Sequence, residues 1–187
     1  MSTVIYSKGR LITDSSLVTS TYNKVVYAPT LGKKLFLSKK RYVVFGISGE
    51  LSDTNDMQDI ADILETTLLE HKCLSLQNED MLSCLKLLLI NQTSGVSFIV
   101  MTSIKYHIYC IRLTIEDNEQ HLSISQIDYN SHYTIGSGCF IAHAALASGY
   151  DIYEALRQTI KYDYSTKGPI MSLDITNLTA YTDEEVV

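Results

Sequence analysis

Several chemical signatures are missing from this sequence. The cysteines are scattered and include no CxxC pair, and the five histidines lack the spacing of zinc ligands. These absences predict reduced thiols in a reducing, cytoplasmic compartment rather than a disulfide framework. They also predict that the protein has no metal and no cofactor. The four cysteines are Cys73, Cys84, Cys110 and Cys139.

Long apolar runs and a broad basic surface are lacking as well. The longest apolar runs, 87–90 and 96–101, are too short to cross a bilayer, and the N-terminus lacks a basic-then-apolar leader pattern. Acidic residues outnumber basic ones by 21 to 15, giving a net charge of −6. The one basic cluster, at 33–41, is interrupted by apolar residues and is typical of the solvated ends of a hairpin. We therefore expect neither a membrane nor a nucleic-acid partner.

The length and patterning predict a single domain over residues 1–187. The chain is 45% hydrophobic, which is enough for a full core. Strands, two helices, strands, two helices and strands follow one another. Antiparallel sheets that are each covered by a helix pair can pack face to face, so this order predicts an α+β fold, a four-layer α-β-β-α sandwich, although other α+β arrangements also fit. The expected elements are strands at 3–8, 10–14, 24–28, 34–38 and 42–47, helices at 54–72 and 78–91, strands at 95–102, 105–115 and 120–127, helices at 139–148 and 151–161, and strands at 169–175 and 178–181.

The start of the chain carries a distinctive chemical possibility. Ser2 is small enough for Met1 to be removed in a cell. Removal would leave an α-amine and a hydroxyl on one residue, and an α-amine with a pKa of about 8 can accept the hydroxyl proton. Many cytosolic proteins begin Met-Ser, so this pattern needs support from other segments.

Five later segments supply that support, because together with the start they resemble one family in order and spacing. The sequence resembles the proteasome β-subunit family of N-terminal nucleophile hydrolases, most closely HslV-type bacterial peptidases and short HslV-like proteins encoded by bacteriophages. The family usually has Thr where this chain has Ser2. The segments that carry the resemblance are 2–6 (STVIY), 11–15 (LITDS), 32–36 (GKKLF), 45–49 (FGISG), 135–138 (IGSG) and 163–169 (DYSTKGP).

The resemblance implies that Ser2 attacks the carbonyl carbon of a peptide or amide bond, with its own α-amine as the base. Lys34 is then expected beside the hydroxyl, where its positive charge favours the alkoxide, and Asp14 is expected to pair with Lys34. Gly46 is expected to offer a backbone N–H to the oxyanion. The resemblance further implies that Ser137 and Asp163 bond to each other and hold the α-amine, and that Thr166 could support the same network.

Two functions remain open on the sequence. The first is an active hydrolase with Ser2 as nucleophile. The second is a catalytically silent relative that acts in assembly or in interaction with a host protein, since no α-amine adjoins the Ser2 hydroxyl if Met1 stays.

The resemblance also implies that the chain forms a homo-oligomer, with an unfoldase as a possible partner. The leucine-rich helices expected at 54–72 and 78–91 could supply apolar contact surface between subunits, or they could cover only the chain's own sheet.

Overall fold

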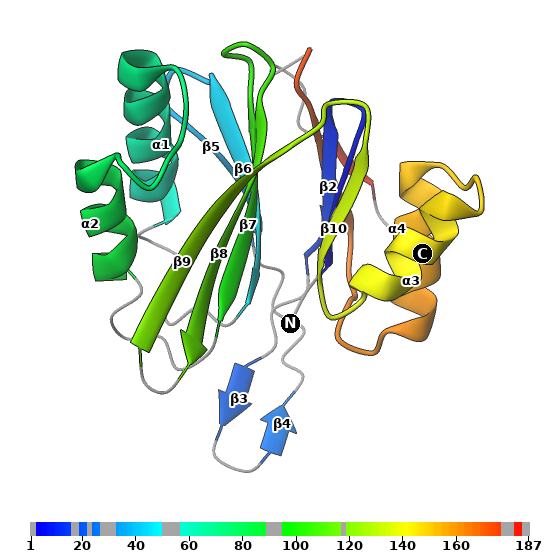
Figure 1. Ribbon diagram of the computed structural model, residues 1–187. Helices are drawn as coiled ribbons and strands as arrows, with labels where there is room; N and C mark the ends of the chain where they lie inside the picture. Colours follow the sequence, from blue (N-terminus) through cyan, green and yellow to red (C-terminus); the bar gives the residue numbers. More distant parts are fainter. Residues whose placement is uncertain are drawn as a thin grey trace.

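Two five-stranded antiparallel sheets form the centre of the protein (Figure 1). The computed structural model describes residues 3–15, 19–21, 24–26, 33–49, 57–88, 95–116, 119–176 and 182–184. The first sheet contains, in spatial order, β10 (His132–Gly136), β1 (Thr3–Ser7), β2 (Arg10–Asp14), β11 (Ile170–Asp174) and β12 (Thr182–Glu184). The second contains β5 (Leu35–Leu37), β6 (Val43–Gly49), β7 (Val96–Thr102), β8 (Ile108–Glu116) and β9 (Glu119–Ile127).

Each large sheet is covered by a pair of helices. The helices α1 (Met57–His71) and α2 (Glu79–Leu88) lie against the second sheet, and α3 (Cys139–Ala147) and α4 (Ile152–Tyr162) lie against the first (Figure 1). The pairing follows from the apolar faces of the helices, since α1 buries Ile60 and Leu64 against Phe45. A separate cluster between the two sheets includes Val4 of β1 and Ile99 of β7. Three layers of buried apolar side chains therefore hold these elements together.

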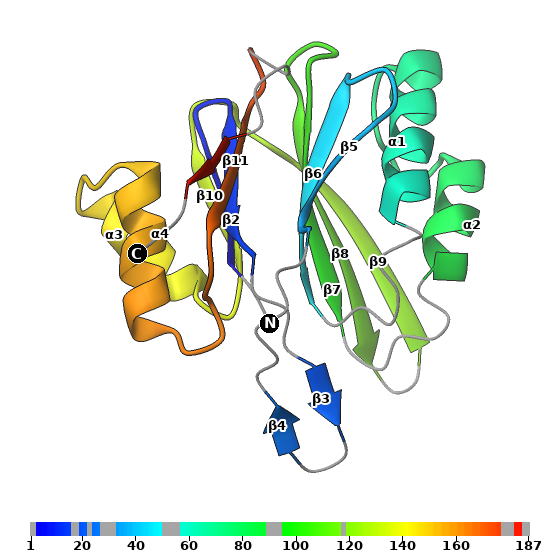
Figure 2. The same ribbon diagram turned by 180° about the vertical axis from the view of Figure 1, so that it is seen from behind.

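The expected four-layer α-β-β-α sandwich is wrong as a description of this chain. The stretch between β2 and β5 was expected to hold one strand at 24–28, but it contains β3 (Thr19–Thr21) and β4 (Lys24–Val26). These strands pair with each other in a two-stranded sheet that stands apart from both larger sheets (Figure 2). The fold is thus mixed and β-rich, with two large antiparallel sheets, a small third sheet and four helices among the described residues.

A strand that the sequence did not reveal brings distant segments together. β10 pairs with β1 so that Gly136 lies opposite Thr3. The GSG motif at 136–138 therefore lies at the end of a strand that pairs with the N-terminal strand. The helix that comes after the turn ends as predicted, because Gly149 adopts φ +90°, a value that favours glycine. Asp151 caps α4 by accepting a hydrogen bond of 2.8 Å from the N–H of Glu154.

The remaining differences concern element ends. The expected start of the helix at 54–72 lies outside the described residues, as does the expected strand at 178–181. Leu64 and Leu68 of α1 and Leu85 of α2 are buried in the chain's own core rather than exposed. Within the described ranges, none of the helices has the length and apolar character needed to cross a membrane.

Helix α1 also holds the turn between β5 and β6. Glu65 of α1 is only 4% exposed and accepts hydrogen bonds from the N–H groups of Lys40 (3.1 Å) and Tyr42 (3.0 Å). The hydroxyl of Ser38 donates to the same carboxylate. These hydrogen bonds to a buried carboxylate fix the turn, and the turn holds the end of β5 in place.

Candidate functional site

A buried ion pair lies where β2 ends and β5 begins. The side chains of Asp14 and Lys34 are 0% and 6% exposed, and the Lys34 Nζ lies 2.9 Å from the Asp14 Oδ2. The other carboxylate oxygen, Oδ1, accepts a hydrogen bond of 2.9 Å from the N–H of Thr3. Burial lowers the pKa of Lys34, and the neighbouring carboxylate opposes this shift only in part. The pair therefore places a lysine of perturbed pKa next to the N-terminal strand.

A second cluster surrounds Asp163 at the end of α4. Its Oδ2 accepts hydrogen bonds of 2.6 Å from the hydroxyls of Ser137 and Thr166, and its Oδ1 accepts one of 3.1 Å from the N–H of Ser165. Burial by itself raises the pKa of Asp163, but these donors outweigh it, so the pKa lies below its usual value of 3.8. The carboxyl is therefore an anion at neutral pH.

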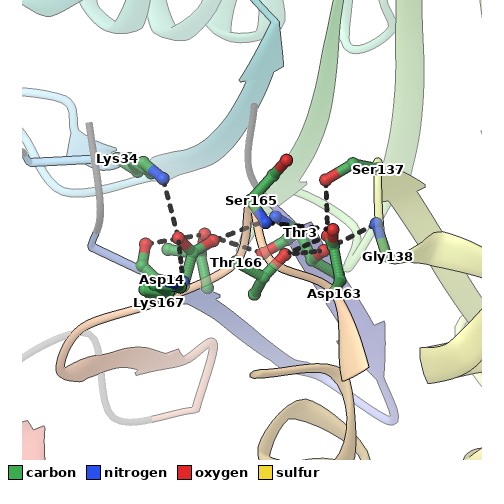
Figure 3. A network of polar contacts seen from close by, with 10 residues as sticks. Thr3, Asp14, Lys34, Ser137, Gly138, Asp163, Ser165, Thr166 and Lys167 are labelled. Atoms are coloured by element: carbon green, nitrogen blue, oxygen red, sulfur yellow. Dashed lines mark hydrogen bonds and ion pairs between the residues drawn. The ribbon is translucent and has the colours of Figure 1, made fainter. Parts of the chain in front are cut away.

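Thr3 joins the two clusters. Its hydroxyl oxygen lies 2.8 Å from the Thr166 Oγ1 and accepts a hydrogen bond of 3.1 Å from the N–H of Gly138. Figure 3 shows Lys34 and Asp14 on one side of this network, with Thr3 and Thr166 between them and the Ser137–Asp163 side. One continuous polar network thus connects β1, β2, the start of β5, the turn into α3 and the segment after α4.

The structure brings four of the sequence-predicted residues into this network: Asp14, Lys34, Ser137 and Asp163. Ser2 lies outside the described residues, so its role stays a prediction. Thr166, expected to support the Ser137–Asp163 contact, also lies in the network. Thr3 and Gly138 were not among the predicted site residues. The GSG motif was a signal for Gly138, whereas Thr3 carries no local signal of its own.

Gly46 does not join the network. The N–H of Ile47 donates to the carbonyl of Lys34 at 3.2 Å, and neighbouring residues of an antiparallel strand direct their N–H groups to opposite sides. The N–H of Gly46 is therefore directed toward β7, where the register pairs it with Ile99. A Cβ at this position would lie 2.6 Å from the Cγ1 of Val4, so glycine is needed here for packing between the sheets. The expected oxyanion contact from Gly46 is corrected on this ground.

Other parts of the molecule offer less for catalysis. A cavity of about 820 Å³ lies between α1 and α2, lined by residues such as Asp62, Glu70 and Glu79, and it is separate from the network. In the part of the chain that the structure describes, no group of three or more His, Cys, Asp or Glu side chains could hold a metal ion.

Comparison with solved structures gives relatives at low identity. Anbu from Hyphomicrobium sp. strain MC1 is 13% identical with a TM-score of 0.58, and the match covers 100% of this chain and 88% of that one. Anbu from Pseudomonas aeruginosa, solved as a helical assembly, is 14% identical with a TM-score of 0.53 and coverage of 99% and 86%. Anbu (ancestral beta-subunit) from Yersinia bercovieri is 11% identical with a TM-score of 0.50 and coverage of 92% and 81%.

The chain shares the fold of the Anbu proteins. No protein-family model and no curated protein matches it. The resemblance to HslV-type and phage HslV-like hydrolases is therefore wrong, because the matching structures are Anbu proteins, which are proteasome-like but distinct from that group. The short motifs of the resemblance do not separate proteasome-like groups from one another. What the likeness shows is the fold of the Anbu proteins.

Proposed function

We propose that this protein, after removal of Met1, hydrolyses peptide or amide bonds with Ser2 as the nucleophile. The observation that carries the proposal is the contact of the Thr3 N–H with Asp14, at 2.9 Å. Residue 2 is covalently bonded to that nitrogen, and the same carboxylate holds Lys34. The backbone nitrogen that joins Thr3 to residue 2 is therefore hydrogen-bonded to the buried ion pair.

In the first step, the Ser2 hydroxyl oxygen attacks the carbonyl carbon of the substrate. The C–O bond forms as the α-amine of Ser2 takes the hydroxyl proton, and the carbonyl oxygen becomes an oxyanion. The intermediate then collapses, the C–N bond breaks and the ammonium group returns the proton to the leaving amine. This step leaves an ester on Ser2. Water then attacks the ester carbonyl carbon and gives up a proton to the α-amine. The bond between that carbon and the Ser2 oxygen breaks, the ammonium group returns the proton to the Ser2 oxygen, and the carboxylic acid leaves.

The two halves of the network support different parts of this reaction. Lys34 supplies positive charge next to the hydroxyl and so lowers the free energy of the alkoxide, while Asp14 fixes the ammonium group. Asp163, held as an anion by its donors, and Ser137 orient the α-amine. The α-amine must be neutral to act as base, and the nearby Lys34 charge lowers the pKa of that amine.

Gly49 is a better-placed oxyanion donor than Gly46. Its N–H is directed to the β5 side of β6, because it lies an even number of residues beyond Ile47, whose N–H bonds to Lys34. Gly49 ends β6 with φ +143°, a conformation that favours glycine. Its position at the strand end leaves the backbone half-buried rather than enclosed within the sheet.

The proposal is tested with purified protein in which intact mass verifies the loss of Met1. A panel of fluorogenic peptide and small amide substrates should show turnover. Ser2→Ala should lower kcat by at least about 10³-fold, as removal of a nucleophile does in other hydrolases, while Ser2→Thr should keep activity. Protein that retains a residue before Ser2 should be as inactive as Ser2→Ala. Full activity of Ser2→Ala, or no turnover by verified Met-free protein, rejects the hydrolase.

The second candidate function is a silent assembly protein, and one observation favours self-association in either case. Seven large apolar side chains are exposed in the described residues, and four of them belong to the α3–α4 layer. Phe140 in the first turn of α3 is 84% exposed, and α3 contains no Asp, Glu, Lys or Arg. The four are Phe140, Tyr150, Tyr162 and Tyr164.

We propose that this layer contacts a second copy of the chain. Two copies that each carry a net charge of −6 repel each other, and this repulsion is weakest where the contacting faces are uncharged. Helix α3 offers such a face, because it contains no Asp, Glu, Lys or Arg. One Anbu relative was solved as a helical assembly. Phe140→Ser should reduce the mass measured by light scattering, whereas Leu76→Ser, at an apolar residue between α1 and α2 that is 53% exposed, should not. A monomer at high concentration for the wild type rejects self-association.

The proposed location is the cytoplasm, since none of the four cysteines forms a disulfide. An unfoldase or a host protein is a further proposed partner.

A further inference from the structure

Thr3 is fixed through every polar group that it carries. Its N–H donates to Asp14 at 2.9 Å, and its carbonyl accepts from the hydroxyl of Thr13 at 2.9 Å. Its hydroxyl contacts Gly138 and Thr166, and the residue is 0% exposed. A backbone held in this way cannot shift without breaking several buried hydrogen bonds, each costly to lose.

The donors and acceptors define one direction for the hydrogen bonds. The Thr166 hydroxyl donates to the Asp163 carboxylate, an acceptor-only group, so Thr166 must accept from Thr3. The Thr3 hydroxyl therefore donates its single hydrogen to Thr166. It accepts in turn from the N–H of Gly138, which precedes α3. The chain runs from Gly138 through Thr3 and Thr166 to Asp163, with no alternative arrangement of the protons.

Glycine at position 138 makes this chain possible. A Cβ there would lie 2.6 Å from the Thr3 Oγ1 and 2.1 Å from the Cγ2 of Thr159. The φ of Gly138 is −89°, which other residues adopt readily, so the requirement for glycine is one of space alone. The close approach of the α3 turn to Thr3 is therefore built into the sequence.

We propose that Thr3 is a positioning residue that sets the nucleophile of residue 2 relative to both halves of the site. This inference rests on the proposed function. The proposed mechanism requires the hydroxyl of residue 2 beside the Asp14–Lys34 pair, to which the Thr3 N–H is bonded. It requires the α-amine beside Asp163, to which the Thr3 hydroxyl is linked through Thr166. A displacement of about 1 Å between reacting groups can cost about 10²-fold in rate, so this link controls turnover.

The test compares Thr3→Val, which keeps the shape but removes the hydroxyl, with Thr3→Ser, which keeps the hydroxyl. Thr102→Val is the matched control, because Thr102 is equally buried and its hydroxyl also accepts a backbone N–H, from Ile104 at 2.9 Å. We expect Thr3→Val to lower kcat about 10- to 100-fold with little change in KM. Thr3→Ser should keep most of the wild-type kcat, and Thr102→Val should have the same kcat as wild type.

A second readout separates this inference from the hydrolase proposal. In Met-free protein, the pH dependence of acylation by a small amine-reactive reagent reports the pKa of the α-amine, whether or not the protein is a hydrolase. Thr3→Val should shift that pKa, and Thr3→Ser and Thr102→Val should not. An unchanged amine pKa in folded Thr3→Val overturns the positioning role, as does unchanged kcat in an active enzyme. If wild type shows no turnover but Thr3→Val still shifts the amine pKa, only the hydrolase proposal is rejected.

Discussion

Removing one charge of the buried ion pair provides the sharpest physical test of the site. Asp14→Asn keeps the shape of the side chain but leaves the Lys34 ammonium, 6% exposed in the native protein, without a counter-charge. Loss of one member of a buried pair usually costs about 3–5 kcal/mol of unfolding free energy. Lys34 can escape this cost by losing its proton. Deprotonating a lysine of ordinary pKa, 10.5, at pH 7 costs about 5 kcal/mol, so Asp14→Asn should not lower the free energy of unfolding by more than that.

The pH dependence of this variant then has a definite sign. If native Lys34 is neutral in Asp14→Asn while the unfolded lysine is protonated, the unfolded state binds more protons and stability rises with pH. The slope is about 1.4 kcal/mol per pH unit below the unfolded pKa. Urea unfolding at pH 7 and pH 9 should therefore show the deficit relative to wild type shrinking by about 2–3 kcal/mol.

Two controls make the reasoning refutable. Lys34→Met should cost less than Asp14→Asn, because the Asp14 carboxylate keeps hydrogen bonds from the backbone N–H groups of Thr3 and Lys167. Asp174→Asn in the exposed Arg10–Asp174 pair should cost less than about 1 kcal/mol, with no change between pH 7 and pH 9. An Asp14→Asn deficit that is equal at both pH values would show that Lys34 stays charged, contrary to the argument.

Three further perturbations follow from the same structure. Ser137→Ala should lower the free energy of unfolding by about 1–3 kcal/mol at pH 7. This loss should disappear as the pH falls through the lowered pKa of Asp163, because the carboxyl is then protonated in both the folded and the unfolded state. Urea midpoints measured over a series of acidic pH values check this. Glu65→Gln should cost about 2–4 kcal/mol at neutral pH, since it weakens the charged acceptor of the β5–β6 turn, and equilibrium unfolding checks it. Gly46→Ala should cost about 1–3 kcal/mol through contact with Val4, and a lowered Tm with unchanged amine reactivity of Met-free protein would agree with a packing role.

Local patterns in the sequence predicted most of the elements. The apolar spacing in α1 and the cap at Asp151 each depend on residues a few positions apart, so they could be read directly. β10 was missed because the polar residues at its start hide the strand, and its stability comes from pairing with β1. The β3–β4 pair was missed because its strands are too short to show a period.

The position of a candidate-site residue could be predicted only where a motif marked it. Asp14, Lys34, Ser137 and Asp163 lie in recognisable segments, and they fall in one network. Thr3 could not be predicted, because its importance arises from partners 135 and 163 residues away. Gly46 was misassigned because a motif does not show which way a backbone N–H points. The HslV resemblance failed for a related reason, since its short motifs are shared beyond that group.

The contact between Thr3 and Thr166 spans 163 residues, and this span sets an order of events in the cell. A ribosome adds about 5–20 residues each second, so roughly 10–30 s separate the emergence of the two threonines. Throughout that interval Thr3 lacks its last partner, and β1 lacks β10 until residue 136 has been made. The proposed removal of Met1 by an aminopeptidase would therefore meet an open chain end during synthesis. The network around Thr3 closes only when the chain is nearly complete, after the interval in which that cleavage would occur.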